Sequence, residues 1–481
     1  MLGYHPSNTS LVKLMPAHHF YQLLLRDVDF GFVRPLFEPF YSPIGRPSID
    51  PLVFVKLLLV SHLENITSNR KLLELATLHV GIRAFLGYGL EQSLPCHSTL
   101  ARTRQRIPVS VFDTCFSHIV GLCIHKGLVS GHTQVIDSAY IKANASMSRL
   151  KPKPAIWSSQ AHSTTLGKPR PPRLTASVDR LQHIHRFHKN IQKAAPNKAG
   201  QLLSNLTHYS PTDSDARIAF KTGKPRQLSY MTSVSVDAAH HVITHIQANS
   251  ADRRDSRNLL PIVDTTQDRL KRFGVVMSNV VADAGYSSGE NYEQLEIRGL
   301  TGFVSPHGKY KDERPGFDYD PKSDHYICSQ GNHLAFDKLL VDKQGNPKKR
   351  YLAKASECKN CPIGEQCKGK KASEKRLYDT YYKAQYERVV KRLSSRFGKR
   401  MMRLRSATVE PVLGSLVNYY GLRQINTRGR EAAAKVMYVA AMAYNLKKFL
   451  RFTSVEQGGM VIALPVPDQF CYILIYFCNS H

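Results

Sequence analysis

Acidic residues are scarce in this chain of 481 residues, which has 37 Asp and Glu against 67 Lys and Arg. The resulting formal charge of +30 makes a polyanion the expected partner, with nucleic acid first and an acidic membrane surface second. No apolar run reaches the roughly 18 residues that a membrane-spanning helix needs. We therefore expect no membrane span, and the charge points to nucleic acid.

Other common signals are also missing. The N-terminus has no basic segment followed by an apolar core, so no secretory signal is expected. Nine cysteines are too few for a disulfide scaffold, which favours a reducing cytoplasm. Neither a Walker loop nor a G-x-G-x-x-G motif is present, so the common nucleotide-binding signatures are absent. With 42% hydrophobic residues, the chain can build folded cores, and its length suggests about three structural units.

Residues 1–130 have the pattern of a helical domain. Asp50 followed by Pro51 is an N-cap pair, and the apolar segment 52–63 behind it predicts a buried helix. A later short helix, 99–107, carries three arginines: Arg102, Arg104 and Arg106. Short helices joined by turns, ending in an Arg-rich one, are typical of helix-turn-helix DNA-binding domains. We predict that the three arginines bind DNA, and a helical bundle with a solvated basic face is the alternative.

From Thr133 the pattern changes to that of a mixed α/β sheet. The β-type runs lie at 134–138, 228–236, 242–247, 275–283 and 301–305, and helices are expected at 252–272, 287–298, 407–420 and 430–452. The second and third runs are separated by a short polar turn and predict a hairpin.

Three acids in this part of the chain stand out. Asp137 and Asp283 end β-type runs, where the ligand sites of open sheets gather, and Glu410 lies near the start of a late helix. Carboxylates on separate elements are the hard oxygen ligands that Mg²⁺ prefers. Two such cations, about 3.5–4 Å apart, promote phosphoryl transfer. The trio predicts that chemistry, although an acid at a strand end is more often a turn former or a helix cap.

The motifs around these acids resemble those of the DDE transposases of bacterial insertion sequences, in the branch whose core carries a cysteine-bearing insertion. Five ordered motifs within residues 10–452 carry the resemblance. They are GRPSIDPLVFVKLLLVSHLENITSNRKL, VIDSAYIKANAS, SPTDSDAR, VADAGYSS, and VEPVLG followed by NTRGREAAAKVMYVAAMAYNLKKF.

The resemblance implies a ribonuclease-H-like core, an α/β fold with a mixed sheet, in residues 131–305 and 376–452. It makes Asp137, Asp283 and Glu410 the catalytic acids that bind two Mg²⁺ ions, or Mn²⁺. It also places Arg405 near the helix start as a contact to a DNA phosphate. The implied reaction is cleavage of double-stranded DNA at the ends of the element, followed by attack of the freed 3′-hydroxyl on target DNA. A homo-oligomer on DNA and a cytoplasmic, nucleoid-associated location in a bacterium are also implied.

One position departs from the family pattern. Val417 stands where the family often has a Lys, seven residues after the Glu. A catalytically degenerate DNA-binding remnant is therefore one alternative function, and a ribonuclease-H-like nuclease without strand transfer is another. Asp213 and Asp215, within a matching motif, are alternative acids, but turn formers are the simpler interpretation. The tail at 453–481 has no functional interpretation.

Residues 306–375 form a polar insertion with four of the nine cysteines. Cys358 and Cys361 have a spacing favourable for Zn²⁺, and Cys328 and Cys367 would complete a set of four thiolates. His325 or His333 is the alternative for one sulfur. A structural Zn²⁺ would supply folding energy to an insertion with little core, and unpaired thiols in a loop are the plainer interpretation.

The positive charge is concentrated in two segments. Residues 148–200 hold 11 Lys and Arg against one acid, and residues 368–405 hold 14 against three. The first segment, rich in proline, is typical of an extended insert or a plain linker. We expect both segments to contact phosphates around an acidic, metal-binding centre.

Overall fold

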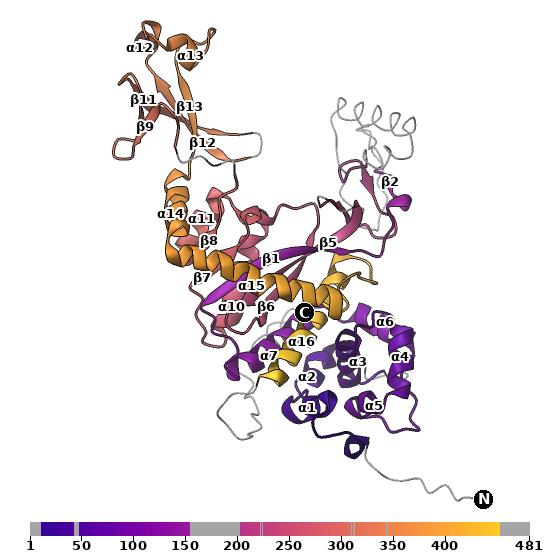
Figure 1. Ribbon diagram of the computed structural model, residues 1–481. Helices are drawn as coiled ribbons and strands as arrows, with labels where there is room; N and C mark the ends of the chain where they lie inside the picture. The colour runs from indigo at the N-terminus through magenta and orange to yellow at the C-terminus, as the bar shows by residue number, and fades with distance from the viewer. Residues whose placement is uncertain are drawn as a thin grey trace, which may run out of the picture. The chain divides into compact units, whose positions relative to one another are not determined.

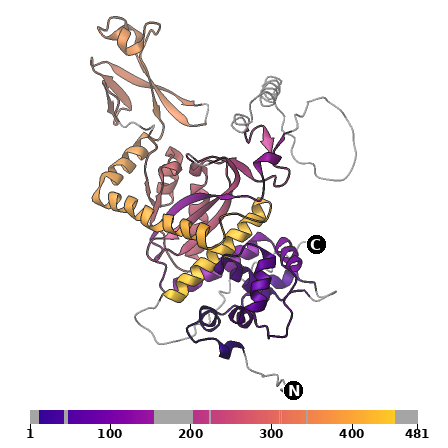
Figure 2. The same cartoon turned by 45° about the vertical axis from the view of Figure 1, so that its right-hand side comes forward.

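Figures 1 and 2 show the computed structural model of the chain. It describes residues 11–42, 48–153 and 203–452, apart from 222, 224, 309, 311–312 and 343–344. These residues form two compact units. The first comprises the described residues up to Leu128 with 419–421 and those from Tyr438 on, and the second comprises Val129–Asn418 and Leu422–Met437. Most of the basic segment 148–200, and the tail at 453–481, lie outside the described residues.

The first unit is built from helices. They are α1 (Phe20–Asp27), α2 (Val33–Phe37), α3 (Pro51–Leu63), α4 (Asn69–Leu78), α5 (Val80–Leu86), α6 (His97–Arg106), α7 (Val109–His125) and the second half of α16 (Arg430–Arg451), with short 3₁₀ turns η1 (Leu11–Leu14) and η2 (Glu38–Phe40). The prediction for α3 is confirmed, because Asp50 Oδ1 accepts the Leu52 N–H at 2.6 Å and the residues from Val53 to His62 are buried.

The end of α16 packs within this helical unit. The Lys126 ammonium, just after α7, donates to the Phe449 carbonyl at 2.8 Å, and the rings of Phe116 and Tyr438 lie 5.6 Å apart. Residues 440–443 of α16 are buried. The helical unit therefore includes the residues from Tyr438 on, which the sequence analysis had assigned to the domain of the sheet.

The second unit contains the mixed sheet that the sequence predicted. Its strands are β1 (Thr133–Lys142), β4 (Arg217–Ala219), β5 (Gln227–Asp237), β6 (Ile243–Ser250), β7 (Asn279–Ala282) and β8 (Thr301–Val304). They run in the order β4-β5-β1-β7-β8. β6 lies outside this order and pairs with β5 on the same side as β4 does, at other residues of β5. β1 is antiparallel to β5 and parallel to β7, which is parallel to β8. The predicted hairpin is confirmed by the antiparallel pairing of β5 and β6. A separate two-stranded sheet joins β2 (Lys151–Pro152) to β3 (His208–Tyr209).

Two predicted elements next to this sheet are shorter than expected. The strand expected at 275–283 covers only Asn279–Ala282, because β1 begins at Thr133, the partner of Asn279, and offers no earlier ladder position. The helix expected at 252–272 begins only at Leu259, as α10 (Leu259–Lys271), after the 3₁₀ turn η4 (Asp255–Arg257). α10 packs on β6, and α11 (Gly289–Ile297) packs on β8.

The cysteine-bearing insertion is a folded sheet rather than the loop that its polar composition suggested. Five antiparallel strands lie in the order β13-β12-β11-β10-β9. They are β9 (Phe317–Asp320), β10 (His325–Cys328), β11 (His333–Val341), β12 (Pro347–Ala353) and β13 (Arg376–Thr380), with helices α12 (Ala355–Lys359) and α13 (Gly364–Lys368). A small core of Tyr326, Leu334, Tyr351, Ala353 and Leu377 holds them together. Tyr326 and Tyr351 are the largest side chains of this core, and they lie in a segment whose overall composition is polar.

Two helices return the chain from the insertion to the sheet. α14 (Lys383–Ser394) is tied to α11 by the bidentate ion pair of Arg388 with Glu296, at 3.0 and 2.6 Å. α15 (Arg396–Tyr419) is longer than the predicted helix 407–420, because the preceding Arg, Lys, Leu and Met residues are strong helix formers. Glu410 and Arg405 therefore lie within the helix, and the expectation that they lie near its start is wrong.

Candidate active site

Asp137 and Asp283 lie at the point where two neighbouring strands stop pairing. The parallel ladder of β1 and β7 ends at Ile136–Ala282, and each acid directly follows that last pair. Residues in register on neighbouring strands point to the same face, so the ladder directs both carboxylates to one side of the sheet. Asp283 Oδ1 accepts the Ala284 N–H at 2.7 Å and caps the 3₁₀ turn η5 (Ala284–Tyr286).

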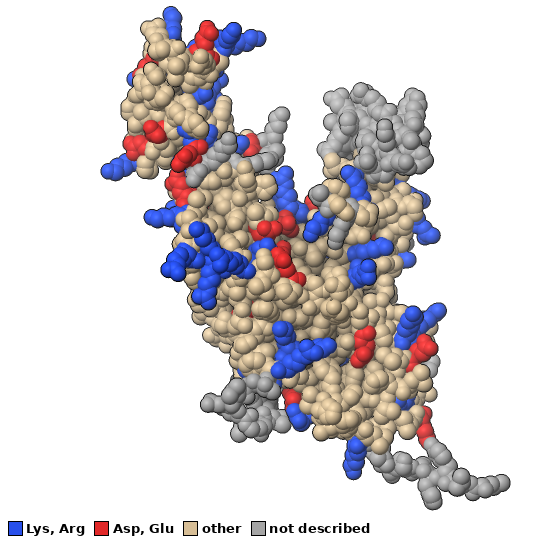
Figure 3. All heavy atoms as spheres, viewed as in Figure 1, with Lys and Arg blue, Asp and Glu red and all other residues tan. Residues whose placement is uncertain are grey.

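Glu410 is joined to Asp137 through Arg405. The guanidinium lies 3.2 Å from Asp137 Oδ2 and 3.1 Å from Glu410 Oε1. The Asp137 side chain is 19% exposed and that of Glu410 is 55% exposed, so the site runs from a buried acid to an open one. On the face of the second unit shown in Figure 3, acidic atoms gather where α15 crosses β1, with Lys and Arg atoms on both sides. The strand acid and the helix acid therefore face one cationic position.

A fourth acid, Asp255, lies beside this group and was missed by the sequence interpretation. It begins η4, the turn that follows β6, and a Cβ on Gly285 would stand 3.1 Å from its Oδ2 atom. Its Oδ1 atom is buried and has no hydrogen-bond partner in the described part of the chain. No strand-end signal marks it, because it lies five residues after β6 ends at Ser250 and Asp252 is nearer to that end.

Burial and mutual repulsion set the ionisation of these acids. Desolvation raises the pKa of Asp137 to about 6, against the opposing effects of the Ser138 N–H and the Arg405 guanidinium. The negative charges of Asp283 and Asp255 raise this pKa further. Burial, and then the charge of Asp283, also raise the pKa of Asp255. Extra positive charge at this site would therefore be stabilising.

The donor chemistry of the site suits a hard divalent cation, which prefers carboxylate oxygens. Within residues 11–42, 48–153 and 203–452, and their short gaps aside, no three His, Cys, Asp or Glu side chains are arranged as a ready-made metal site. Between Asp137 and Glu410, Arg405 supplies the positive charge. The residue types fit a metal centre, and the acids would have to exchange Arg405 for cations.

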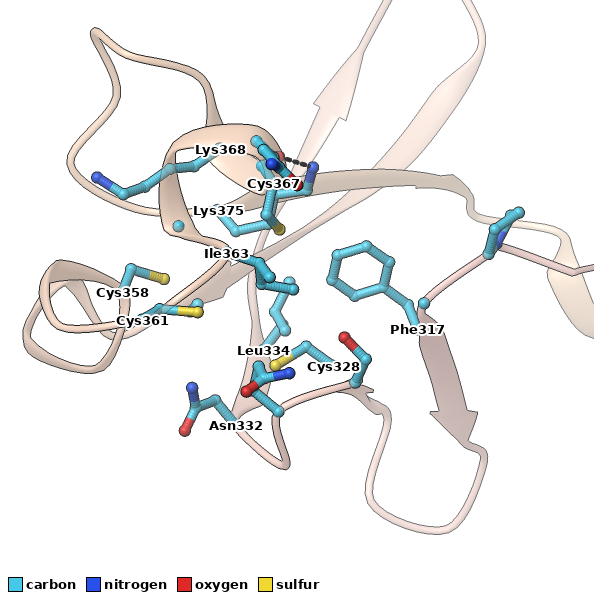
Figure 4. Close-up of a pocket in the computed structure, with 17 residues that line it drawn as sticks. Phe317, Cys328, Asn332, Leu334, Cys358, Cys361, Ile363, Cys367, Lys368 and Lys375 are labelled. Atoms are coloured by element: carbon cyan, nitrogen blue, oxygen red, sulfur yellow. Dashed lines mark hydrogen bonds between the residues drawn. The ribbon is translucent and has the colours of Figure 1, made fainter.

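The four cysteines predicted as zinc ligands line one pocket of the insertion, with a volume of about 340 Å³ (Figure 4). They come from β10, α12, the following turn and α13: Cys328, Cys358, Cys361 and Cys367. All four are half-buried free thiols. Figure 4 shows Cys358 and Cys361 side by side. The alternative ligands, His325 and His333, stack on each other at 4.5 Å and are not among the residues that line the pocket.

The three arginines predicted to bind DNA differ in exposure. They lie on α6, which meets α7 at 94°, an angle typical of helix-turn-helix pairs. Arg102 is exposed, whereas Arg104 is half-buried. Arg106 is exposed but stacks on the Tyr41 ring at 4.8 Å. Arg102 is therefore the most open of the three to a ligand.

The alternative acids, Asp213 and Asp215, anchor the turn that precedes α16. Both Asp213 oxygens accept the Tyr230 hydroxyl, at 2.6 and 2.7 Å, and Oδ1 also accepts the Gly429 N–H at 3.2 Å. Asp215 accepts the Arg430 N–H at 2.9 Å. These contacts agree with the simpler interpretation of the two acids as turn-stabilising residues.

Comparison with known proteins places two parts of the chain in families. Residues 9–106 match a family described as transposase domain (DUF772), and residues 327–450 match the transposase DDE domain. The second match contains Arg405 and Glu410, and the strand acids lie between the two matches. No curated protein matches the chain.

The match to a DDE domain covers residues after the mixed sheet. Together with that sheet, it implies a ribonuclease-H-like core and supports a metal-dependent enzyme that cleaves nucleic acid. The two matches support an insertion-sequence DDE transposase, a class of enzyme that binds DNA. Among the described residues, no single helix is both long and apolar enough to cross a membrane.

Proposed function

We propose that this transposase cleaves double-stranded DNA at the ends of its insertion sequence and joins the freed 3′-hydroxyl to target DNA, with Asp137, Asp283 and Glu410 as the catalytic acids. The observation that carries the proposal is the convergence of Asp137 and Glu410 on Arg405, with Asp283 on the neighbouring strand. Asp137 on β1, Asp283 just after β7 and Glu410 on α15 are the three acids that the resemblance implies.

The three acids would hold two Mg²⁺ ions, or Mn²⁺. When bound, such cations activate the attacking oxygen and stabilise the leaving one. Asp137 is the most rigid of the acids, because β1 pairs with β5 opposite Val234 and its Oδ1 accepts the Ser138 N–H at 2.7 Å. Glu410 approaches from α15 and is open to solvent, so it can adjust to the bound DNA.

Arg405 would then bind the DNA backbone. With cations bound by these acids, Asp137 and Glu410 would no longer need the charge of the guanidinium, and Arg405 would be free to leave them. A guanidinium offers paired N–H donors that fit two phosphate oxygens. Arg405 is 15% exposed at the edge of the acidic site, where it would orient the strand to be cut.

The two chemical steps balance without another cofactor. In the first, water attacks a phosphodiester at the end of the element and the P–O3′ bond breaks, which leaves a 3′-hydroxyl and a 5′-phosphate. In the second, that 3′-hydroxyl attacks a phosphodiester of the target and displaces the target's own 3′-oxygen. One phosphodiester bond is exchanged for another.

The remaining parts of the chain would support this reaction. We assign the helical unit, with Arg102, Arg104 and Arg106, to recognition of the element's ends, and the four insertion cysteines to a structural Zn²⁺. Two ends must be brought together, so we propose a homo-oligomer on DNA that acts at the nucleoid in the bacterial cytoplasm.

The proposal is tested by conservative substitution of the acids. Asp137→Asn, Asp283→Asn and Glu410→Gln should each reduce cleavage of DNA bearing the element's terminal repeats by at least about a thousandfold, while binding to that DNA is largely kept. Asp268→Asn, a change at an exposed acid on α10, is the matched control and should cut normally. Cleavage in Mg²⁺ by the Asp283→Asn protein would contradict the assignment.

Val417 favours one alternative, a degenerate copy that binds DNA without cutting it. It is half-buried on α15, two turns beyond Glu410, where the family often has a Lys. Wild-type protein that binds the repeats but yields no nicks in Mg²⁺ or Mn²⁺ would support this alternative. Nicks without joined products would instead indicate a nuclease without strand transfer.

A further inference from the structure

Backbone pairing alone does not fix the separation of Asp137 and Asp283. The ladder between β1 and β7 ends one residue before each acid, at Ile136–Ala282. Beyond that point β1 continues beside β5 to Lys142, whereas the chain after β7 turns away into η5. The position of the Asp283 turn against β1 therefore depends on contacts between side chains.

Tyr286 makes such a contact. Its hydroxyl is hydrogen-bonded to Ser138 Oγ at 2.5 Å, and Ser138 directly follows Asp137. Ser138 Oγ is in turn 2.6 Å from Ser233 Oγ on β5, which accepts the Asn249 amide of β6 at 2.9 Å. A chain of polar groups thus joins the Asp283 turn to three strands of the sheet.

Tyr286 is itself firmly placed. It is 1% exposed, and the Asn291 amide donates to its carbonyl at 2.8 Å. The same amide donates to the Ser256 carbonyl at 2.7 Å, so the turn that carries Asp255 is bound to the turn that carries Asp283. A shift of the Tyr286 ring would disturb both turns, whereas loss of its hydroxyl alone would release only the link to Ser138.

We propose that Tyr286 is a positioning residue whose hydroxyl, through Ser138, sets the separation between Asp137 and Asp283 and with it the affinity of the site for divalent cations. The inference rests on the proposed function, since it takes the two acids as metal ligands. Groups that hold ligands in place from behind typically change metal affinity by about 10- to 100-fold when they are lost.

The test is the binding of Mn²⁺, measured by electron paramagnetic resonance on the full chain without DNA. Tyr286→Phe keeps the buried ring and should weaken Mn²⁺ binding by about tenfold, with an unchanged circular dichroism spectrum. Tyr292→Phe is the matched control. Tyr292 is 2% exposed, and its hydroxyl donates to Ser287 Oγ at 3.0 Å and the Val304 carbonyl at 3.1 Å, not to β1. Its loss should leave the Mn²⁺ affinity unchanged.

A second variant tests the pairing itself. Ser138→Ala should weaken Mn²⁺ binding in the same direction, and the double variant with Tyr286→Phe should lose little more than one single change. Equal affinities of wild type and Tyr286→Phe, or equal losses in Tyr286→Phe and Tyr292→Phe, would overturn the inference. Asp283→Asn separates this from the proposed function, because Mn²⁺ binding that survives Asp283→Asn contradicts the metal site itself.

Discussion

At the scale of single residues, the site is governed by the burial of Asp137. Its carboxylate is held on a strand between two neighbours, and desolvation raises its pKa to about 6. Arg405 partly offsets that cost by pairing with it. An acid with this pKa carries a full charge only near neutral pH or above, which links cation binding to pH.

The first prediction concerns the pH dependence of Mn²⁺ binding. Because Asp137 binds a cation only as a carboxylate, affinity should be highest above about pH 7 and fall by up to about tenfold per pH unit below about 6. Asp255→Asn removes a charge that raises the pKa of Asp137, so the fall should move to lower pH. Binding titrations between pH 5 and 8 test both statements, and a flat affinity over that range would contradict them.

Without metal, the free energy of unfolding should fall as the pH rises, whereas the affinity for Mn²⁺ should increase. The folded pKa of Asp137, about 6, lies above the ordinary value of 3.8, so the folded protein binds this proton more tightly than the unfolded chain does. Its contribution to the free energy of unfolding is therefore present below about pH 4 and is lost as the pH rises through about 6. With a chelator present, Asp137→Asn should flatten this part of the stability profile, measured by urea unfolding.

At the scale of elements, α15 carries much of the proposed chemistry. Arg405, Glu410 and Val417 all lie on it, and a spacing of seven residues places Glu410 and Val417 on the same face of the helix. The helix contains Pro411 directly after Glu410, and a proline cannot donate the usual helical hydrogen bond. The backbone next to Glu410 therefore lacks one helical hydrogen bond.

Val417→Lys should add a phosphate contact at the position where the family often has a Lys. We expect tighter binding to DNA ends, and a slope of log affinity against log salt that is steeper by about one. Val417→Met, which fills a similar volume without charge, is the control. The measurement is a fluorescence anisotropy titration at several salt concentrations, and identical slopes for the two variants would count against this role for position 417.

The sequence predicted the strand acids better than it predicted their partners. Asp283 directly follows β7, as its apolar run predicted. The prediction that Asp137 ends a strand is wrong, because β1 continues beside β5 to Lys142. The pairing of Arg405 with Asp137 joins a late helix to the first strand of the sheet, and no local pattern encodes such a long-range contact. The insertion was misjudged because Tyr326 and Tyr351 build its core within a polar segment.

The insertion yields a prediction about zinc. Four cysteines line one pocket, and they would have to move closer together to form a tetrahedral thiolate site. If they do, purified protein should contain about one zinc per chain. Cys361→Ser should lose the metal and lower the melting temperature, whereas Cys96→Ser, at an exposed thiol of the helical unit, should keep it. Elemental analysis that finds no zinc in the wild-type protein would leave the four thiols without this role.

At the scale of the whole molecule, positive charge surrounds a small acidic site. Residues 368–405 carry 14 Lys and Arg against three acids and lead along α14 and α15 to Arg405. The segment 148–200 carries a comparable excess, and most of it lies outside the described residues. Most of the net charge of +30 therefore lies in two segments suited to phosphate contacts.

Deletion of residues 150–198 should flatten the salt dependence of DNA binding, because fewer counterions are released when fewer phosphates are contacted. The slope should fall by roughly 0.9 for each contact that is lost. A variant of the same length with Gln in place of the Lys and Arg of this segment separates charge from chain length. A slope that stays unchanged in both variants would make the segment a linker.

We propose above all that this chain cuts DNA and joins the cut ends to a target. The most direct measurement incubates the wild-type protein and Mg²⁺ with a duplex that carries the inverted repeats flanking its gene, together with a target plasmid. The protein should produce nicks at the repeat ends and products in which those ends are covalently joined to the plasmid. Protein that binds the repeats but yields neither nicks nor joined products in Mg²⁺ or Mn²⁺ would contradict it.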